Sequence, residues 1–263
     1  MKNNPYLPFP SKIIAVKQQT AIDWTFRFES GVTPVPGQFM EISIPGIGEA
    51  PISISDFGSG WIEMTIRKVG RLTNAVFELK PGAILYMRGP YGNGFDLERC
   101  CGKNLLIVAG GTGLAPVKSV ISHFCRHRGS IQGFELIIGF KTPSDILFHD
   151  EIEEWRKTAG VILTVDHGDD AWHGCTGVVT RYIDDFEFHP GITEAIIVGP
   201  PLMMKFSALS LLQRGVPEER IVVSFERKMS CGIGKCGHCK IDNTYICLEG
   251  PVFEYSKARQ LLD

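Results

Sequence analysis

The feature that most constrains the fold is a group of cysteines near the end of the chain. They are spaced C-x4-C-x2-C-x7-C, at Cys231, Cys236, Cys239 and Cys247. The first three match the loop of plant-type ferredoxins, in which a more distant fourth cysteine completes the ligands of a [2Fe–2S] cluster. Gly232, Gly234 and Gly237 supply the tight turns and close backbone approach that such a loop requires. The spacing predicts a [2Fe–2S] cluster held by these four thiolates.

Two alternatives use the same cysteines. A structural zinc site also takes four thiolates, but it usually shows two C-x2-C pairs, whereas this stretch has one. A disulfide framework is typical of secreted chains, and we expect none here. With four thiolates available, His238 is expected to face solvent or to form a hydrogen bond rather than bind metal. The remaining cysteines, which lack the spacing for a second cluster, are Cys100, Cys101, Cys125 and Cys175.

The first part of the chain reads as short strands separated by glycine and proline. A closed antiparallel barrel is the expected arrangement, because closure removes exposed sheet edges. One short helix is expected at Thr73–Leu79, ended by Pro81 and Gly82. The expected strands, rich in β-branched and aromatic residues, are Ser11–Gln18, Ile22–Glu29, Gln38–Ile44, Pro51–Ser55 and Trp61–Lys68.

From about residue 104 apolar strands alternate with helical stretches. This alternation predicts a parallel, doubly wound α/β sheet. The sequence thus divides into a barrel domain over 1–98, an α/β domain over 99–225 and a cysteine-bearing tail over 226–263. The expected strands are Leu105–Ala109, Phe134–Ile138, Val161–Val165, Ala195–Val198 and Ile221–Ser224. The expected helices are Ala115–His127, His149–Ala159, Val178–Phe186 and Leu202–Gln213.

A glycine-rich turn follows the first of these apolar strands. Gly110–Pro116 has the form G-x-G-x-x-P, and its glycines let the backbone approach a pyrophosphate at the start of a helix. A second turn, Gly199-Pro200-Pro201, follows the fourth strand. Since ligands of doubly wound sheets lie beyond the carboxyl ends of the strands, Gly110 and Gly199 are expected to border one crevice. A loop that only starts a helix explains Gly199 equally well, and Met203 and Met204 are expected in the core.

Two fragments of the expected barrel could serve a flavin. Pro51–Ile54 ends a strand, and Arg67–Thr73 leads into the short helix. Gly70 and Thr73, followed by a helix, could cradle a phosphate. A turn with a helix cap explains Gly70 and Thr73 equally well.

Taken together, the order of these parts resembles the ferredoxin–NADP reductase superfamily. Within it the chain is similar to the family of B subunits of anaerobic sulfite reductases, with the sulfhydrogenase gamma and dihydroorotate dehydrogenase electron-transfer subunits as near relatives. The tail from Glu226 to Cys239 carries the most specific part of the resemblance. The other matching stretches are Asn4–Pro8, Pro51–Ser53, Gly70–Thr73, Gly89–Gly92, Gly110–Pro116 and Gly199–Pro201.

The resemblance implies FAD on the barrel and NADH on the α/β domain. The superfamily usually has an arginine where this chain has Ala50 and an aromatic residue where it has Ile52, so Arg67 is left to meet the pyrophosphate charge. FMN and NADPH stay open as alternatives, the latter because Lys141 could contact a 2′-phosphate. The implied flavin residues are Pro51, Ile52, Ser53, Thr65, Ile66, Arg67, Gly70, Leu72 and Thr73. The implied dinucleotide residues are Gly111, Thr112, Gly113, Gly199 and Pro200.

Three sites of this kind form one path for electrons. A nicotinamide gives up two electrons as hydride, an iron–sulfur cluster accepts one at a time, and a flavin does both. Hydride transfer needs no acid or base from the protein, so we assign no catalytic residue. The resemblance implies an electron-transport flavoprotein that serves sulfite reduction and whose partners are the iron–sulfur and sirohaem subunits of a sulfite reductase. The alternatives are a dihydroorotate dehydrogenase or sulfhydrogenase partner and, outside enzymes, a zinc-stabilised nucleotide-binding module.

Composition excludes some other classes. The chain has 263 residues and a formal net charge of −2, which gives no general attraction to nucleic acid or anionic lipid. No apolar run approaches the roughly 20 residues of a membrane helix. Met1–Pro8 has no apolar core of the signal-peptide type. We therefore expect a cytoplasmic protein.

Overall fold

The computed structural model describes residues 4–185 and 189–261. The chain divides into two compact units, and each is made of two separate segments. Unit 1 contains residues 1–95 and 225–252, and unit 2 contains residues 96–224 and 253–263. The cysteine-bearing stretch 231–247 therefore belongs to the same unit as the barrel. Met1 to Asn3 of the N-terminal stretch and Phe186 of one expected helix lie outside the described residues.

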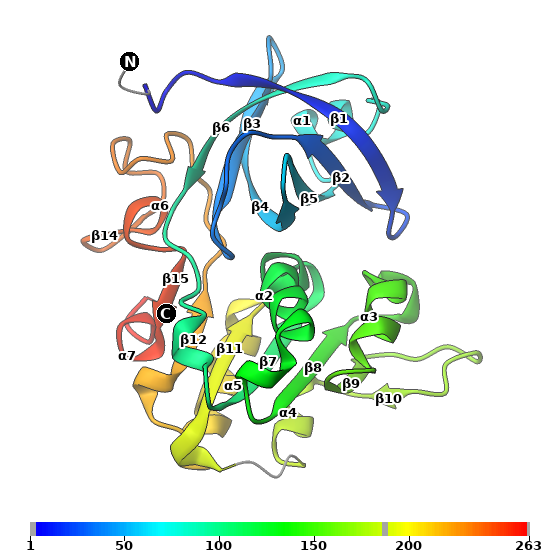
Figure 1. The fold of residues 1–263 in the computed structure, drawn as a ribbon, viewed down its shortest axis with the longest axis vertical. Helices are drawn as coiled ribbons and strands as arrows, with labels where there is room; N and C mark the ends of the chain where they lie inside the picture. Colours follow the sequence, from blue (N-terminus) through cyan, green and yellow to red (C-terminus); the bar gives the residue numbers. More distant parts are fainter. Residues whose placement is uncertain (1–3, 186–188, 262–263) are drawn as a thin grey trace. The chain divides into compact units, whose positions relative to one another are not determined.

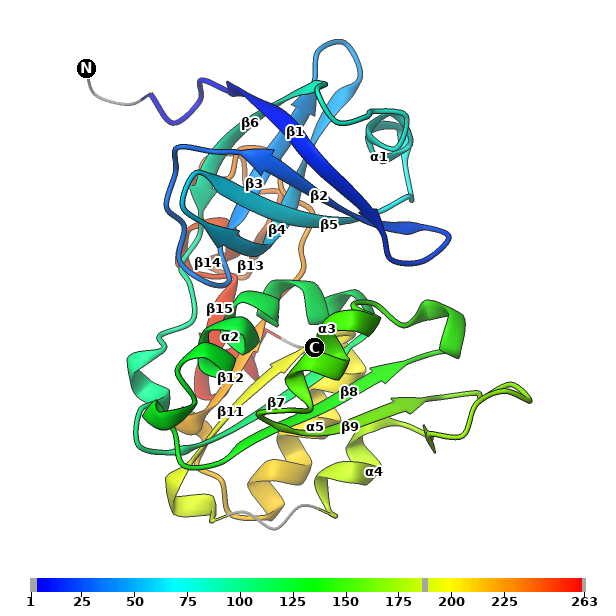
Figure 2. The same ribbon diagram turned by 45° about the vertical axis from the view of Figure 1, so that its right-hand side comes forward.

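Unit 1 contains a closed antiparallel barrel, as the sequence predicts. Its strands follow the order β1-β2-β5-β4-β3-β6, and β1, β2 and β5 run side by side in one wall (Figure 2). The helix α1 spans Arg71–Val76, and so starts two residues earlier than expected. The strands are β1 (Phe9–Gln18), β2 (Asp23–Glu29), β3 (Phe39–Ile44), β4 (Gly48–Gly58), β5 (Trp61–Arg67) and β6 (Ile84–Tyr91) (Figure 1).

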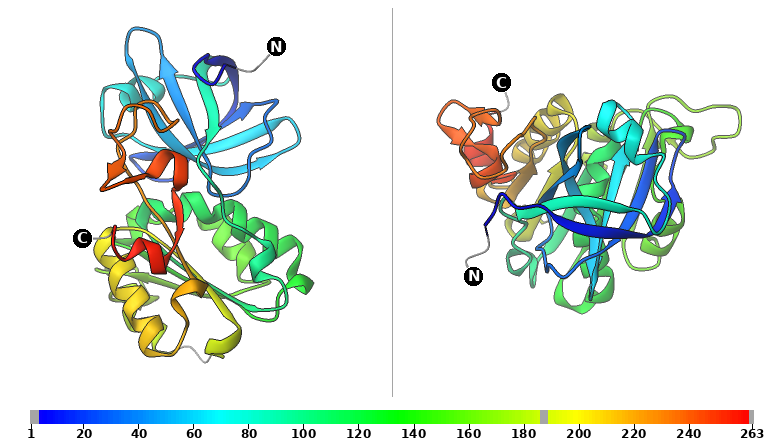
Figure 3. Two further views of the ribbon diagram at one scale, coloured as in Figure 1. Left: turned by 90° about the vertical axis from the view of Figure 1, so that its left-hand side faces the viewer. Right: turned by 90° about the horizontal axis from the view of Figure 1, so that it is seen from above.

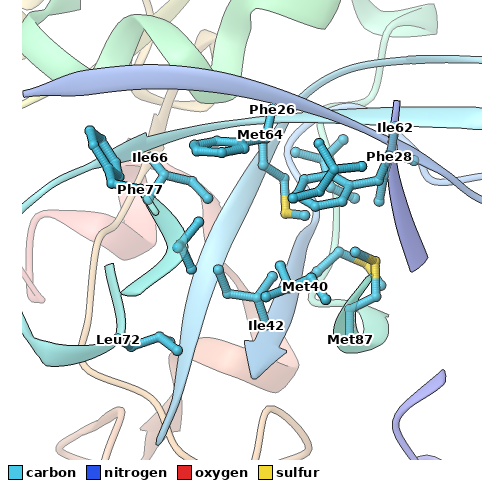
Figure 4. Close-up of a cluster of buried hydrophobic side chains, with 14 residues drawn as sticks. Phe26, Phe28, Met40, Ile42, Ile62, Met64, Ile66, Leu72, Phe77 and Met87 are labelled. Carbon is cyan, nitrogen blue, oxygen red and sulfur yellow. The ribbon is translucent and has the colours of Figure 1, made fainter. Parts of the chain in front are cut away.

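The barrel interior is a continuous apolar core to which every strand contributes. Alternate residues of a strand point to opposite faces, so Met40 and Ile42 face inward while Glu41 between them faces out. Phe26, Phe28 and Met64 lie close to one another in this core (Figure 4). This packing fixes the register of each strand, because a shift by one residue would turn the apolar face outward.

Strand β6 is not among the strands expected from the sequence. Its second half contains Arg88, Gly89 and Pro90, which weaken a strand signal. Leu85 and Met87 nevertheless belong to the core, and β6 closes the barrel by pairing with both β1 and β3.

Unit 2 is a doubly wound α/β domain. Its sheet has the strand order β10-β9-β8-β7-β11-β12-β15, and the pairs from β10 to β12 are parallel. Helices α2 and α5 lie on opposite faces of the sheet (Figure 3). The strands are β7 (Asn104–Gly110), β8 (Phe134–Phe140), β9 (Gly160–Val165), β10 (Cys175–Thr176), β11 (Thr193–Val198), β12 (Ile221–Ser224) and β15 (Val252–Glu254). The helices are α2 (Leu114–Arg126), α3 (His149–Trp155), α4 (Val179–Ile183), α5 (Pro201–Gln213) and α7 (Tyr255–Ala258).

The tail adds small elements to both units. In unit 1 the strands β13 (Lys240–Ile241) and β14 (Thr244–Tyr245) form a hairpin, and α6 (Ile246–Glu249) follows it. In unit 2 the strand β15 joins the sheet beside β12, where the sequence predicted no strand. Among the described residues, no helix has the length and apolar character needed to cross a membrane.

Candidate functional site

The cysteine loop directs its backbone N–H groups at its own sulfur atoms. The N–H of Gly234 lies 3.1 Å from Cys247 Sγ, and that of Lys235 lies 3.3 Å from Cys231 Sγ. The N–H groups of Cys236 and Cys247 lie 3.4 Å from Cys231 Sγ and Cys239 Sγ. Such donors stabilise negative charge on thiolate sulfur and tune an iron–sulfur cluster. The loop therefore has the donor geometry that a cluster requires.

The four thiols influence one another in pairs. Beyond the larger effects of the His238 backbone and of burial, the Cys231 side chain lowers the pKa of the Cys236 thiol, and the Cys239 side chain raises that of the Cys247 thiol. Within the described parts of the chain, no three Cys, His, Asp or Glu side chains converge on one metal-ion position. The [2Fe–2S] type of the cluster stays a prediction from the spacing of the cysteines.

The paired thiols differ in their surroundings. A backbone hydrogen bond from His238 lowers the pKa of the Cys236 thiol, which lies at the surface. Burial raises the pKa of Cys247 to about 12, and the neighbouring Cys239 thiol adds to this effect. The cluster site thus has one exposed side at Cys236 and a buried side at Cys239 and Cys247.

A buried carboxylate lies on the outer face of the barrel near this loop. Glu41 is fully buried, and among the described residues neither of its side-chain oxygens has a hydrogen-bond partner. Burial raises its pKa from 4.5 to about 7, against the opposing charge of Arg88, while Glu49 and Cys231 raise it further. The hydroxyl of Tyr91 accepts a hydrogen bond from Arg88 and is influenced by the charge of Glu41. The sequence did not single out Glu41, because alternation in β3 makes it look like a solvent-facing residue.

We expect Glu41→Gln to stabilise the protein relative to the wild type, with a gain that builds up between about pH 4.5 and pH 7 and persists at higher pH. Below pH 4.5 the carboxyl group is protonated in the folded and unfolded chains alike. As the pH rises to about 7, the unfolded chain loses this proton while the folded chain keeps it, so the wild type loses stability. The variant should therefore gain on the order of 2 kcal/mol relative to the wild type between pH 5 and pH 8.

Thermal unfolding at pH 5 and pH 8 measures this difference. Glu29→Gln is the matched control, because Glu29 is an exposed residue paired with Lys12 at 3.8 Å. An equal gain for Glu41→Gln at both pH values would contradict the raised pKa.

The barrel has an open seam between β4 and β5. Residues 51–53 of β4 pair with β3, and residues 65–67 of β5 pair with β2. The two strands pair with each other only from Ile54 and Met64 onward. The facing edges of both strands therefore have backbone N–H and C=O groups without a strand partner. These edges carry six of the residues predicted for the flavin, Pro51, Ile52, Ser53, Thr65, Ile66 and Arg67.

The side chains at this seam have different roles. Ile66 and Leu72 belong to the barrel core, so only their backbone could meet a ligand. The Thr73 hydroxyl accepts hydrogen bonds from the N–H groups of Val69 and Gly70, both at 3.0 Å. Thr73 thus caps the turn before α1, as the alternative interpretation held. Its contact with a phosphate stays a prediction, as do the contacts of the exposed Gly70.

Arg67 is held in place by a carboxylate that the sequence did not single out. Its Nε and Nη2 atoms donate to the two oxygens of Asp23, at 2.8 and 3.0 Å. Asp23 is fully buried and also accepts from the Thr20 hydroxyl at 2.8 Å. A bidentate pair of this kind fixes a guanidinium precisely enough to orient it toward a bound anion.

The two glycine turns of unit 2 meet where β7 and β11 end. Val198 pairs with Ala109, which brings the turns that follow them together. A Cβ atom added to Gly113 would lie 2.5 Å from the Val198 carbonyl oxygen, and one added to Gly199 would lie 3.2 Å from Gly110 Cα. Gly110 and Gly199 therefore lie side by side at the carboxyl ends of β7 and β11, and the ligand crevice between them stays a prediction.

The same two turns contain features that bear on a dinucleotide. Gly111 has a positive φ of 56°, which favours glycine, and has open space beside its Cα. Met204 is buried in the core as expected, but Met203 lies against both Gly110 and Gly199. The contacts of Thr112 and Pro200 with a dinucleotide stay predictions.

Comparisons with known proteins support a dinucleotide-binding domain and an iron–sulfur binding domain. Residues 107–208 match the family model of the oxidoreductase NAD-binding domain. Residues 226–258 match the iron–sulfur cluster binding domain of dihydroorotate dehydrogenase B. The sulfhydrogenase 1 gamma subunit of Pyrococcus furiosus is 38% identical over 96% of this chain and 92% of its own length. The chain belongs to the ferredoxin–NADP reductase-like superfamily.

Within this superfamily the chain lies close to two kinds of subunit. Besides the sulfhydrogenase gamma subunit, a probable dihydroorotate dehydrogenase B electron transfer subunit of P. furiosus is 33% identical over 87% of this chain and 83% of its own length. The chain is thus an NAD(P)H-dependent oxidoreductase subunit.

Solved structures of ferredoxin–NADP reductase-like proteins have the same fold. The NADH-dependent reduced ferredoxin–NADP oxidoreductase superposes with a TM-score of 0.78 at 26% identity, over 94% of this chain and 88% of that one. A ferredoxin NADP+ reductase from Neisseria gonorrhoeae, at 18% identity, has a TM-score of 0.70 over 82% of this chain and 97% of that one. This second likeness concerns the fold alone.

Proposed function

We propose that the chain oxidises NADH and passes the electrons through FAD and a [2Fe–2S] cluster to a partner subunit. The observation that carries the proposal is the set of backbone N–H groups directed at the sulfurs of Cys231, Cys239 and Cys247, in the unit that also holds the open barrel seam. The spacing of these cysteines and the backbone donors around them support the [2Fe–2S] type.

The residues of the chain bind and orient the redox groups. A flavin, when bound, accepts a hydride and releases its electrons singly, which links a two-electron donor to a one-electron acceptor. The open edges of β4 and β5 offer backbone donors and acceptors for its ring, and Arg67 offers a positive charge for its phosphates. With Ala50 in place of the usual arginine, that role falls to Arg67. Gly111 and Gly113 let the backbone approach a dinucleotide pyrophosphate at the start of α2.

The identity of the partner subunit has two candidate answers. The relatives that lie close in sequence are gamma and electron transfer subunits of a sulfhydrogenase and of a dihydroorotate dehydrogenase. They support a hydrogenase-type or dihydroorotate dehydrogenase partner more directly than a sulfite reductase, which remains the second candidate. The surface at Cys236, where the cluster site is exposed, is the proposed exit for electrons.

The cofactors can be tested on the chain alone. Protein purified without air should contain flavin, iron and acid-labile sulfide, and its visible absorbance should bleach on addition of NADH. Parallel titrations with NADPH decide between the two dinucleotides, and mass analysis of the released flavin decides between FAD and FMN. A colourless protein that contains zinc would overturn the proposal and support a nucleotide-binding module.

The partner can be tested by reconstitution. The loaded chain and NADH are added to hydrogenase, dihydroorotate dehydrogenase or sulfite reductase subunits that lack their own electron-transfer subunit. We expect electrons to reach a sulfhydrogenase-type partner. Product formation only in the assay with sulfite reductase subunits would favour a sulfite reductase instead. Transfer to none of the three would contradict the proposed role as a subunit.

A further inference from the structure

Arg88 of strand β6 is almost completely buried. Only 6% of its side chain is exposed, although arginine is rarely buried without partners. It faces the outside of the barrel, opposite Glu41 in the ladder between β3 and β6. A buried guanidinium that stays charged at all relevant pH values must satisfy its donors through other groups of the protein.

One side of this guanidinium is fixed by the barrel. Its Nε atom donates to Glu49 Oε2 at 2.9 Å, and its Nη2 atom donates to Glu49 Oε1. Its Nη1 atom donates to the Tyr91 hydroxyl at 3.2 Å. Two parallel bonds to one carboxylate hold the plane of the guanidinium in a single orientation. The side chain is thus anchored to β4 and β6 before it reaches the tail.

The other side holds the start of the cysteine loop. Nη2 also donates to the Ser230 carbonyl at 2.7 Å, and Nη1 donates to the Cys231 carbonyl. Cys231 is the first predicted cluster ligand, so its backbone is attached to the barrel through one side chain. Charge-assisted bonds of this kind are shorter and stronger than those between neutral groups.

The loop also packs closely against β6 beyond this contact. Gly232 has a φ of 72°, and a Cβ atom there would lie 2.7 Å from the Tyr91 ring. Farther along, the Asn93 side chain donates to the Val252 carbonyl at 2.7 Å and accepts from the Val252 N–H at 3.0 Å. Asn93 thus holds the chain at Val252, after the cysteine loop, whereas Arg88 holds it at Ser230 and Cys231, where the loop begins.

We propose that Arg88 is a positioning residue for the iron–sulfur cluster, fixing Cys231 on the barrel and favouring the reduced state of the cluster. This inference rests on the proposed function, since it requires a cluster at the four cysteines. Reduction adds a negative charge, which the nearby guanidinium stabilises. Without Arg88, the carboxylate of Glu49 would remain near Cys231 uncompensated, which opposes reduction.

The test compares variants purified with their cluster. Arg88→Met removes the bridge, and Arg88→Lys keeps the charge without the fork. The double variant Glu49→Gln with Arg88→Met does not leave the Glu49 carboxylate unpaired. It replaces Arg88→Met in these measurements if the single variant folds poorly. Arg128→Met is the matched control, because Arg128 donates to the carbonyls of Thr158, Ile131 and Gln132 in unit 2, away from the cysteines.

Three measurements report on the role of Arg88. They are amide hydrogen exchange of residues 226–240, the reduction potential of the cluster, and the electron paramagnetic resonance spectrum of the reduced protein. In Arg88→Met we expect exchange around Cys231 to be at least about tenfold faster, which equals about 1.4 kcal/mol of local opening. The potential should shift to more negative values and the spectrum should change, whereas Arg88→Lys should recover part of the potential.

The outcomes separate this inference from the proposed function. If both Arg88→Met and the double variant contain full iron and show the hydrogen exchange, reduction potential and spectrum of the wild type, this result overturns the role of Arg88 and leaves the cluster in place. Equal effects in Arg128→Met would also overturn it. A wild-type protein without iron would overturn the proposed function and this inference together.

Discussion

Replacing Cys239 by serine is expected to remove the cluster and to stop electron delivery to any partner. Cys239 is only 1% exposed and belongs to the buried pair of thiols, so a hydroxyl group there cannot be compensated by solvent. Flavin reduction by NADH should stay near the wild-type rate, because that step does not involve the cysteines. Transfer to a one-electron protein acceptor should fall by a factor of at least about 100.

Stopped-flow absorbance separates these two steps in one experiment. The control is Cys175→Ser, since Cys175 on strand β10 lies outside the cysteine loop and is half-buried. Iron analysis should show a loss in Cys239→Ser and no loss in the control. Retention of iron and of electron delivery in Cys239→Ser would contradict the assignment of the four cysteines as ligands.

The second large effect is expected from Gly113→Ala in the predicted dinucleotide crevice. A Cβ atom at this position would lie 2.5 Å from the Val198 oxygen and 2.9 Å from Gly199 Cα. Both neighbours are backbone atoms, so the two turns must move apart at a cost of about 1–3 kcal/mol. We expect the KM for NADH to rise at least about tenfold. Transfer from chemically reduced flavin to the cluster should be unchanged.

Two further glycine variants calibrate this effect. Gly129→Ala should behave as the wild type, because an added Cβ there would meet no atom within 4 Å. Gly110→Ala should have an intermediate effect. Its Cβ would lie 2.4 Å from the Met203 sulfur, but the flexible side chain of Met203 can move away. A Gly113→Ala protein with the wild-type KM and melting temperature would contradict the close approach of the two turns.

The sequence predicted the features that depend on local patterns. Apolar runs such as Leu105–Ala109 alternate with helices, and this is enough to predict a parallel sheet. The spacing of Cys231 to Cys247 is likewise local, and so is the glycine turn after β7. The barrel strands β1 to β5 were predicted within a few residues of their ends because β-branched residues and turn residues mark them clearly.

The features that the sequence did not predict depend on distant contacts. Glu41, Glu49 and Arg88 look like the solvent-facing positions of three barrel strands. Their role appears only when Arg88 meets Ser230 and Cys231, which lie 142 and 143 residues farther along the chain. Asp23 was overlooked for the same reason, since its partner Arg67 lies 44 residues away. No local period encodes such pairs, which depend on strand register and on how the tail folds back.

The division of the chain has a consequence for its synthesis. Because unit 1 needs residues 225–252 and unit 2 needs residues 253–263, neither can be finished while the ribosome still holds the C-terminal segment. The barrel strands leave the ribosome first, yet the loop that Arg88 holds is made only after residues 96–224 of the α/β domain have been translated. Iron loading is thereby postponed until residues 231–247 have been made, and a nascent chain interrupted before Cys231 cannot capture metal at this site.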